Sequence, residues 1–89
     1  MHELVLISNL LKILNKIKED DRNIYSFLAI HITVNPYSCI DEENLNFMFR
    51  SVVGKEEIYK DAKICVTRGA NPADREFILD NVEVEVYEE

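Results

Sequence analysis

The chain has 89 residues, of which 47% are hydrophobic and 30% are charged, with only two glycines and two prolines. This composition excludes a disordered or low-complexity chain, and the length leaves room for one compact domain, which we expect to span residues 1–89. Seventeen acidic residues against ten basic ones give a formal charge of −7. Because no segment gathers the basic residues into a stripe, nucleic acid and anionic membranes are poor candidate partners.

The first expected element is an amphipathic helix over residues 4–17, because apolar residues recur there every three or four positions. These residues are Leu4, Ile7, Leu10, Leu11, Leu14 and Ile17. The polar cluster 19–23 predicts the turn that ends the helix. Glu3 precedes the apolar run and lysines follow it, which inverts the order of a secretory signal, and the run is too short to cross a bilayer. We therefore expect a cytoplasmic protein.

A strand over residues 25–34 comes next, because the apolar pattern changes to a period of two. Its predicted faces hold Leu28, Ile30, Ile32 and Val34 on one side and Phe27, Ala29, His31 and Thr33 on the other. Asp41 is a suitable N-cap for a second helix, in which Leu45, Met48, Phe49 and Val52 fall at helical spacing. Gly54 is expected to end it, since glycine adopts the left-handed conformation at low cost.

The rest of the sequence predicts two further strands. Residues 55–60 read as a charged connector, residues 62–67 alternate as a half-buried strand, and residues 68–75 form a turn. In the last strand, residues 77–87, we expect Val82, Val84 and Val86 to face inward. The order is α-β-α-β-β, so we expect an α+β fold with two amphipathic helices packed on one face of a small three-stranded mixed sheet. The last two strands should pair as an antiparallel hairpin, and a right-handed crossover would make the first two parallel if they are neighbours.

Enzymatic machinery is not evident in the sequence. The serines lie in no elbow-like turn, and Gly54 and Gly69 are too isolated to form a phosphate-binding loop. We expect a protein that is not an enzyme, with no catalytic and no cofactor-binding residues. Cys39 and Cys65 belong to no Cys-x-x-Cys pair, so neither a disulfide framework nor a structural zinc site is expected, and both are most simply small buried hydrophobes.

The first three residues, Met1, His2 and Glu3, combine an α-amine, an imidazole and the amides that open a helix. The first four N–H groups of a helix have no intrahelical acceptor, so metal-ligand bonds made by these amides need not break the helix. A square-planar set of nitrogens selects Ni(II) or Cu(II) over Zn(II) or Mg(II). The alternative is that His2 is an exposed residue in a frayed terminus, because terminal residues are usually loose.

The Met-His-Glu start, followed directly by an amphipathic helix, resembles the HypA family of nickel metallochaperones, which help to deliver nickel to [NiFe]-hydrogenase and, in some organisms, to urease. Further similar segments occur in the same order along nearly the whole chain. They are Ile30–Asn35 (Ile-His-Ile-Thr-Val-Asn), which resembles the first strand of the family, Ile40–Phe49, which resembles its Val-x-x-x-x-Leu-x-Phe-x-Phe stretch, Lys60–Ile64 and Phe77–Glu85.

The resemblance implies that Ni(II) is bound as cargo by the amine, backbone amides and side chain of Met1, His2 and Glu3. It also implies a partner protein, either the hydrogenase-maturation GTPase or the hydrogenase large subunit. Family members carry a zinc module with two Cys-x-x-Cys pairs between the second and third strands, where this sequence has the short turn Gly69–Arg75. We therefore expect no structural zinc.

A second hypothesis is a metal-free interaction or dimerisation module that kept the fold and lost nickel delivery. It would dock through the helix-free sheet face, where Tyr25, Phe27 and Tyr87 could supply an apolar patch, or through the edge of the strand Val82–Val86. A second copy of the chain is one such partner. His31 is expected to be a surface or inter-strand residue of that face rather than a metal ligand.

Overall fold

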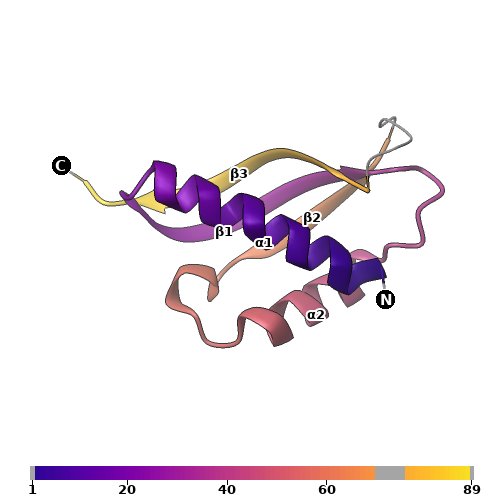
Figure 1. Ribbon diagram of the computed structural model, residues 1–89, viewed down its shortest axis with the longest axis horizontal. Coiled ribbons are helices and arrows are strands. Elements are labelled where there is room, and N and C mark those ends of the chain that lie inside the picture. The colour runs from indigo at the N-terminus through magenta and orange to yellow at the C-terminus, as the bar shows by residue number, and fades with distance from the viewer. Residues whose placement is uncertain (1, 70–75, 89) are drawn as a thin grey trace.

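A three-stranded mixed sheet covered on one face by two helices makes up this computed structural model, which describes residues 2–69 and 76–88 (Figure 1). The predicted α+β class and the α-β-α-β-β order are confirmed. The elements are α1 (His2–Asp20), β1 (Ile24–Val34), α2 (Glu42–Val53), the short 3-10 helix η1 (Glu57–Tyr59), β2 (Lys63–Arg68) and β3 (Ile78–Val86). Among the helices in this part of the chain, none combines the length and hydropathy that a bilayer crossing requires.

The central strand is β1, and the sheet order is β2-β1-β3. β1 pairs with β2 in parallel, from Ala29 opposite Lys63 onward, as expected for a strand-helix-strand crossover. β1 pairs with β3 antiparallel. The predicted hairpin between β2 and β3 is wrong, because β3 pairs with β1 on the side opposite to β2.

Side chains of α2 cover the outer edge of β2. The backbone N–H and C=O groups that they occupy there are not free to pair with β3. The Glu42 carboxylate accepts a hydrogen bond from the Val66 N–H at 2.7 Å. One turn further along α2, the Asn46 amide accepts from the Ile64 N–H at 2.7 Å and donates to the Ile64 carbonyl at 2.8 Å. The helix thus satisfies backbone groups that would otherwise form an open sheet edge.

The segment expected to be a charged connector instead contains η1 and contributes to the core. Tyr59 is only 2% exposed. The Arg50 guanidinium holds this segment against α2 by donating to the carbonyls of Tyr59 at 2.7 Å and Ala62 at 2.8 Å. Hydrogen bonds from the Arg50 side chain to backbone carbonyls therefore hold this segment in place, and the hydropathy of the segment gives no sign of them.

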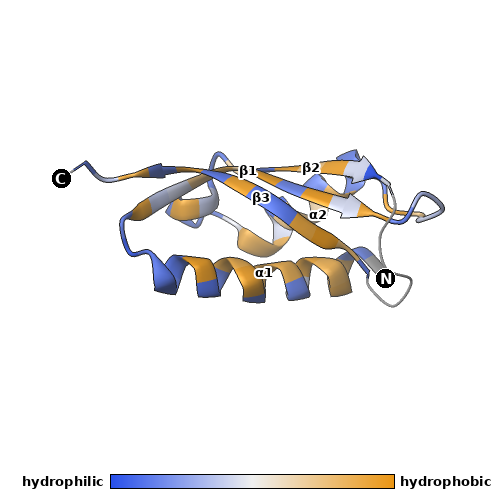
Figure 2. Ribbon diagram, turned by 90° about the horizontal axis from the view of Figure 1, so that it is seen from above, coloured by the Kyte–Doolittle hydropathy of each residue, from blue (hydrophilic) through white to orange (hydrophobic). Residues whose placement is uncertain are grey.

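The core lies between the sheet and the two helices, which occupy the same side of the sheet (Figure 2). The ends of α2 follow the sequence expectation, whereas α1 extends beyond the expected residues 4–17 at both ends. The Asp41 carboxylate accepts from the Asn44 N–H at 2.9 Å, and Gly54 follows α2 with a φ of +60°. Fully buried side chains include Leu6, Leu10, Leu14, Ile30, Ile32, Leu45, Phe49 and Ile64.

A β-bulge corrects the face predicted for Phe27. Phe27 pairs with Val84 and Ala29 pairs with Glu83, so β1 has one more residue than β3 between these pairs. The extra residue shifts the alternation, and Phe27 turns into the core instead of onto the helix-free face. It is fully buried, and its ring stacks on that of Tyr59 with centroids 5.5 Å apart.

At the other end of β3, the expected inward face holds only in part. Val82 and Val84 are half-buried and pack against the core, as predicted. Val86 is 46% exposed, because it lies near the end of the strand and of the sheet.

Candidate metal site at the start of the first helix

Two of the three residues expected to bind nickel, His2 and Glu3, lie at the beginning of α1, which starts at His2. Met1 and the side chain of His2 lie outside the residues that the structure describes. The N-terminal end of α1 lies near one end of the molecule's long axis, which measures 43 Å, and the last residues of β3 lie near the other (Figure 1). Because Met1 and the His2 side chain are not described, the structure does not test the prediction that they bind nickel.

The helix start is fixed in place by the apolar residues that follow it. Leu6 and Ile7 are buried within the first two turns, and Leu10 extends the same face. Glu3 lies in the first turn and is half-buried, and its Oε2 is 3.5 Å from the Asn44 Nδ2 of α2. A carboxylate here interacts favourably with the positive end of the helix dipole. Glu3 thus lies between the two helix beginnings.

The chemistry open to this end of the molecule is anion or metal-ligand chemistry at backbone nitrogens. The first amides of α1 have no intrahelical acceptor. Amides that lose their protons can bind Ni(II) or Cu(II) in a plane, and their negative charge offsets the charge of the metal near the helix dipole. Within residues 2–69 and 76–88, no three His, Cys, Asp or Glu side chains are grouped so that they could hold a metal ion.

His31 is an inter-strand residue of the helix-free sheet face, as predicted. Its Nε2 lies 2.6 Å from Oε2 of Glu83 on the neighbouring strand β3. Next to this pair on the same face, the Thr33 hydroxyl donates a hydrogen bond to the Asp80 carboxylate at 2.6 Å. These polar pairs join β1 to β3 and make the face hydrophilic.

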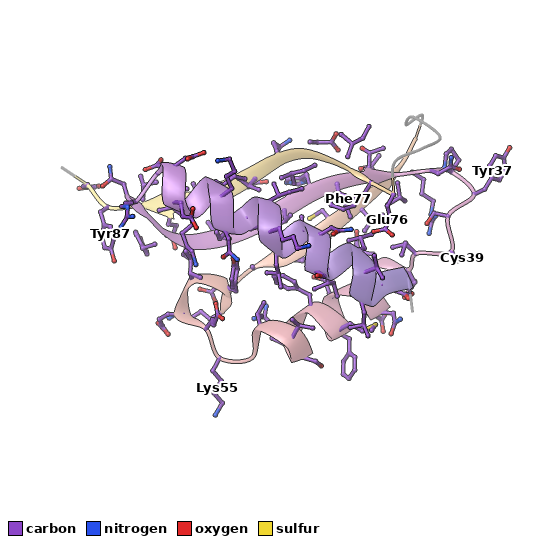
Figure 3. All side chains as sticks on the ribbon, in the orientation of Figure 1. Tyr37, Cys39, Lys55, Glu76, Phe77 and Tyr87 are labelled. Atoms are coloured by element: carbon purple, nitrogen blue, oxygen red, sulfur yellow. The ribbon has the colours of Figure 1, made fainter. Side chains whose placement is uncertain are left out.

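The two cysteines are both free thiols, in different surroundings. Cys65 is half-buried and lies opposite His31 in the parallel register. Cys39 is exposed, so the expectation that it is a small buried hydrophobe is wrong (Figure 3). It belongs to the loop before α2, in which Ile40 is the residue that turns into the core.

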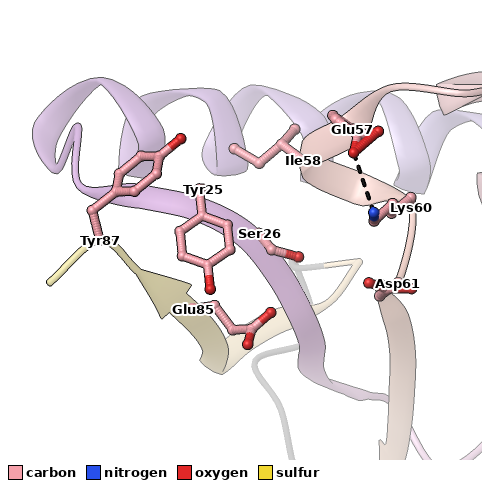
Figure 4. A pocket seen from close by; sticks show the side chains of 8 residues that line it. All are labelled: Tyr25, Ser26, Glu57, Ile58, Lys60, Asp61, Glu85 and Tyr87. Carbon is pink, nitrogen blue, oxygen red and sulfur yellow. Dashed lines mark ion pairs between the residues drawn. The ribbon is translucent and has the colours of Figure 1, made fainter.

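A pocket of about 440 Å³ at the Tyr87 end of the molecule was missed by sequence reasoning (Figure 4). It is lined by Tyr25, Ser26, Glu57, Ile58, Lys60, Asp61, Glu85 and Tyr87. These residues come from three separate segments, and no local spacing connects them. The sequence indicated only one part of this pocket, because Tyr25 and Tyr87 were expected on one patch. Their ring centroids are 4.8 Å apart.

Comparison with known proteins gives a likeness in fold. No protein-family model matches the sequence, and no curated protein matches it at a significant level. Among solved structures, the chain is similar to the solution structure of the Ni metallochaperone HypA from Helicobacter pylori, with a TM-score of 0.73 and 14% sequence identity. The match covers 98% of this chain and 100% of that chain. The fold is therefore HypA-like.

Proposed function

We propose that this chain is a HypA-like nickel-binding accessory protein, not an enzyme, that binds Ni(II) through Met1, His2 and Glu3. One combined observation carries the proposal. The sequence reads Met-His-Glu at residues 1–3, of which His2 and Glu3 open α1, in a fold similar over 98% of the chain to a nickel metallochaperone. The fold likeness and the sequence motif are independent, because 14% identity does not by itself require any particular first three residues.

In this proposal the ligands are mainly nitrogens. The amine of Met1, the imidazole of His2 and backbone amides of the first turn surround the metal in a plane, which suits Ni(II) and Cu(II). The helix dipole disfavours a cation at this position, and deprotonated amides together with the Glu3 carboxylate compensate for it. In this proposal Ni(II) is cargo that is bound and then passed on.

The proposal extends to the surroundings in which such a protein works. Residues 1–89 act as one nickel-binding domain in the cytoplasm and deliver the metal during hydrogenase maturation. The partner is the hydrogenase-maturation GTPase or the hydrogenase large subunit. No structural zinc is required, because the sequence holds Cys39 and Cys65 alone and they form no Cys-x-x-Cys pair.

The test is a titration of tag-free protein with Ni(II), followed by visible absorbance, beside the variants His2→Ala and His31→Ala. We expect about one Ni(II) per chain, with the colour of square-planar nickel bound by amide nitrogens. His2→Ala should abolish that signal with the fold intact. His31→Ala is the matched control, because the other histidine of the chain is occupied by Glu83 and should not affect binding.

The free amine provides a second test. Residues left by an expression tag ahead of Met1 remove that amine and should weaken binding sharply. Equal affinity in tagged and tag-free protein, or equal loss in the two histidine variants, would show that nickel is not bound in this way.

A metal-free docking module is the second candidate, and the position of β3 favours it. The outer edge of β2 is covered by α2, whereas β3 is the other edge strand and pairs only with β1 among the described residues. Glu83 and Glu85 alternate along it and discourage pairing with a second copy of the same acidic strand. His2→Ala separates the two candidates, because a docking module would be unaffected by it.

A further inference from the structure

The pocket beside Tyr87 lies where β1 has no neighbouring strand on its β2 side. Pairing with β2 begins at Ala29, so the first residues of β1 lack a strand partner there. The chain from η1 to Asp61 approaches this part of β1 instead and leaves a pocket of about 440 Å³ (Figure 4). One wall consists of Tyr25, Glu85 and Tyr87, and the other consists of Glu57, Ile58, Lys60 and Asp61.

Ser26 provides a polar group that lacks a partner at the base of this pocket. The residue is 4% exposed, and its Oγ has no hydrogen-bond partner. In Figure 4 its hydroxyl points away from the tyrosines and toward the side of Lys60 and Asp61. A buried hydroxyl without a partner costs free energy, which a ligand that hydrogen-bonds to it would recover.

The charge around the pocket is negative. Glu57, Asp61 and Glu85 face a single cation, Lys60, whose Nζ is paired with Glu57 at 3.2 Å. Within the described part of the chain, Asp61 and Glu85 form no ion pair. The pKa of Lys60 is raised, first by its hydrogen bond to Glu57 and the charge of Glu57, and then by the charges of Asp61 and Glu85, in keeping with a negative pocket.

The two tyrosines add aromatic faces to this negative pocket. Their rings are tilted at 37° with centroids 4.8 Å apart. Tyr25 is 40% exposed and Tyr87 is 61% exposed, so both rings can be reached from solvent. A cation placed on such a face is attracted by the ring quadrupole, and a planar guanidinium can also stack on it.

We propose that this pocket binds a guanidinium group, presented as an arginine side chain by a partner protein. Five N–H donors in a plane match two unpaired carboxylates, the Ser26 hydroxyl and an aromatic face better than a compact ammonium does. An anion would be repelled by the carboxylates, and a neutral apolar group would leave Ser26 without a partner. The inference does not depend on nickel, because the pocket lies at the end of the molecule opposite the start of α1 (Figure 3).

The experiment titrates the ¹⁵N-labelled full chain with N-acetyl-arginine amide and follows the backbone amides by NMR. Its neutral isostere, N-acetyl-citrulline amide, and N-acetyl-lysine amide are titrated in parallel. We expect saturable shifts confined to the amides around Ser26, Asp61 and Glu85, at least roughly tenfold weaker binding of the lysine compound and no binding of the citrulline compound. Added salt should weaken the arginine complex.

Charge variants distinguish a built pocket from general attraction to an acidic protein. The double variant Asp61→Asn, Glu85→Gln should weaken arginine binding by roughly tenfold or more, since it removes both unpaired carboxylates. Glu43→Gln removes an exposed carboxylate of α2 that does not line this pocket, and it should change affinity less than about twofold.

Three results would overturn the proposal. The first is the absence of saturable arginine shifts. The second is binding of the citrulline or lysine compound as tightly as the arginine compound. The third is a loss of affinity in Glu43→Gln equal to that in the pocket double variant, which would assign the shifts to the net charge of −7.

Discussion

Asn46→Ala tests whether the hydrogen bonds from α2 to the edge of β2 stabilise the fold. The Asn46 side chain takes the place of a neighbouring strand, because it accepts from the N–H and donates to the carbonyl of Ile64. The two distances are 2.7 and 2.8 Å, and both bonds are partly buried. Alanine would leave both backbone groups of Ile64 without these partners.

The expected loss follows from the net value of each bond. A hydrogen bond in a folded protein contributes about 0.5–1.5 kcal/mol, so two of them contribute about 1–3 kcal/mol. Alanine returns up to about 0.7 kcal/mol through its higher helix propensity. The free energy of unfolding should therefore fall by about 0.3–2.3 kcal/mol, with a central value of about 1.3 kcal/mol. The Tm should fall by about 4–8 °C for each kcal/mol in a domain of this size.

Urea denaturation followed by circular dichroism measures this change, with Asn44→Ala as the matched control. Asn44 is an exposed residue of the same helix, and among the described residues its side-chain amide makes only long contacts, of 3.5 and 3.9 Å. Its replacement should therefore change the free energy of unfolding by no more than about 0.5 kcal/mol. Asn46→Ala should also increase self-association, because it opens the edge of β2. Equal stability of the two variants would refute the idea that Asn46 closes this edge.

Two further predictions concern single side chains of the core and of a helix end. Burial, with a contribution from Glu56, raises the pKa of Tyr59 above 10.0, so the unfolded chain loses this proton first and stability should fall as pH rises above about 10. Tyr59→Phe should reduce this loss of stability in urea denaturation measured at pH 9–11. At pH 7 the same variant should have unchanged stability or gain up to about 1 kcal/mol, because the Tyr59 hydroxyl has no hydrogen-bond partner. Asp41→Ala should lower the free energy of unfolding by about 1 kcal/mol through loss of the cap to Asn44, whereas Asp41→Asn, which keeps an acceptor, should lower it much less.

Local features of the fold could be predicted because they depend on residues close in sequence. Hydrophobic spacing gave both helices, an N-cap gave the start of α2, and Gly54 gave its end. The crossover rule gave the parallel pairing of β1 and β2. The candidate metal residues are local in the same sense, since Met1, His2 and Glu3 are consecutive, and nickel binding by them stays a prediction.

Features that depend on distant contacts could not be predicted. The side of β1 on which β3 pairs depends on α2, because Asn46 occupies backbone groups at the outer edge of β2. The inward turn of Phe27 needed a bulge, which requires two strands to be compared residue by residue.

The sequence by itself determined the types and the order of α1, α2 and the three strands, and most of their amphipathic faces, because period and capping act within a few residues. Only the tertiary structure decided the strand order, the burial of Tyr59 and the pocket beside Tyr87. Each of these depends on which hydrogen-bonding groups and surfaces remain free after other segments have packed. Which groups remain free depends on contacts between segments that are far apart in sequence, and such contacts leave no periodic pattern along the chain.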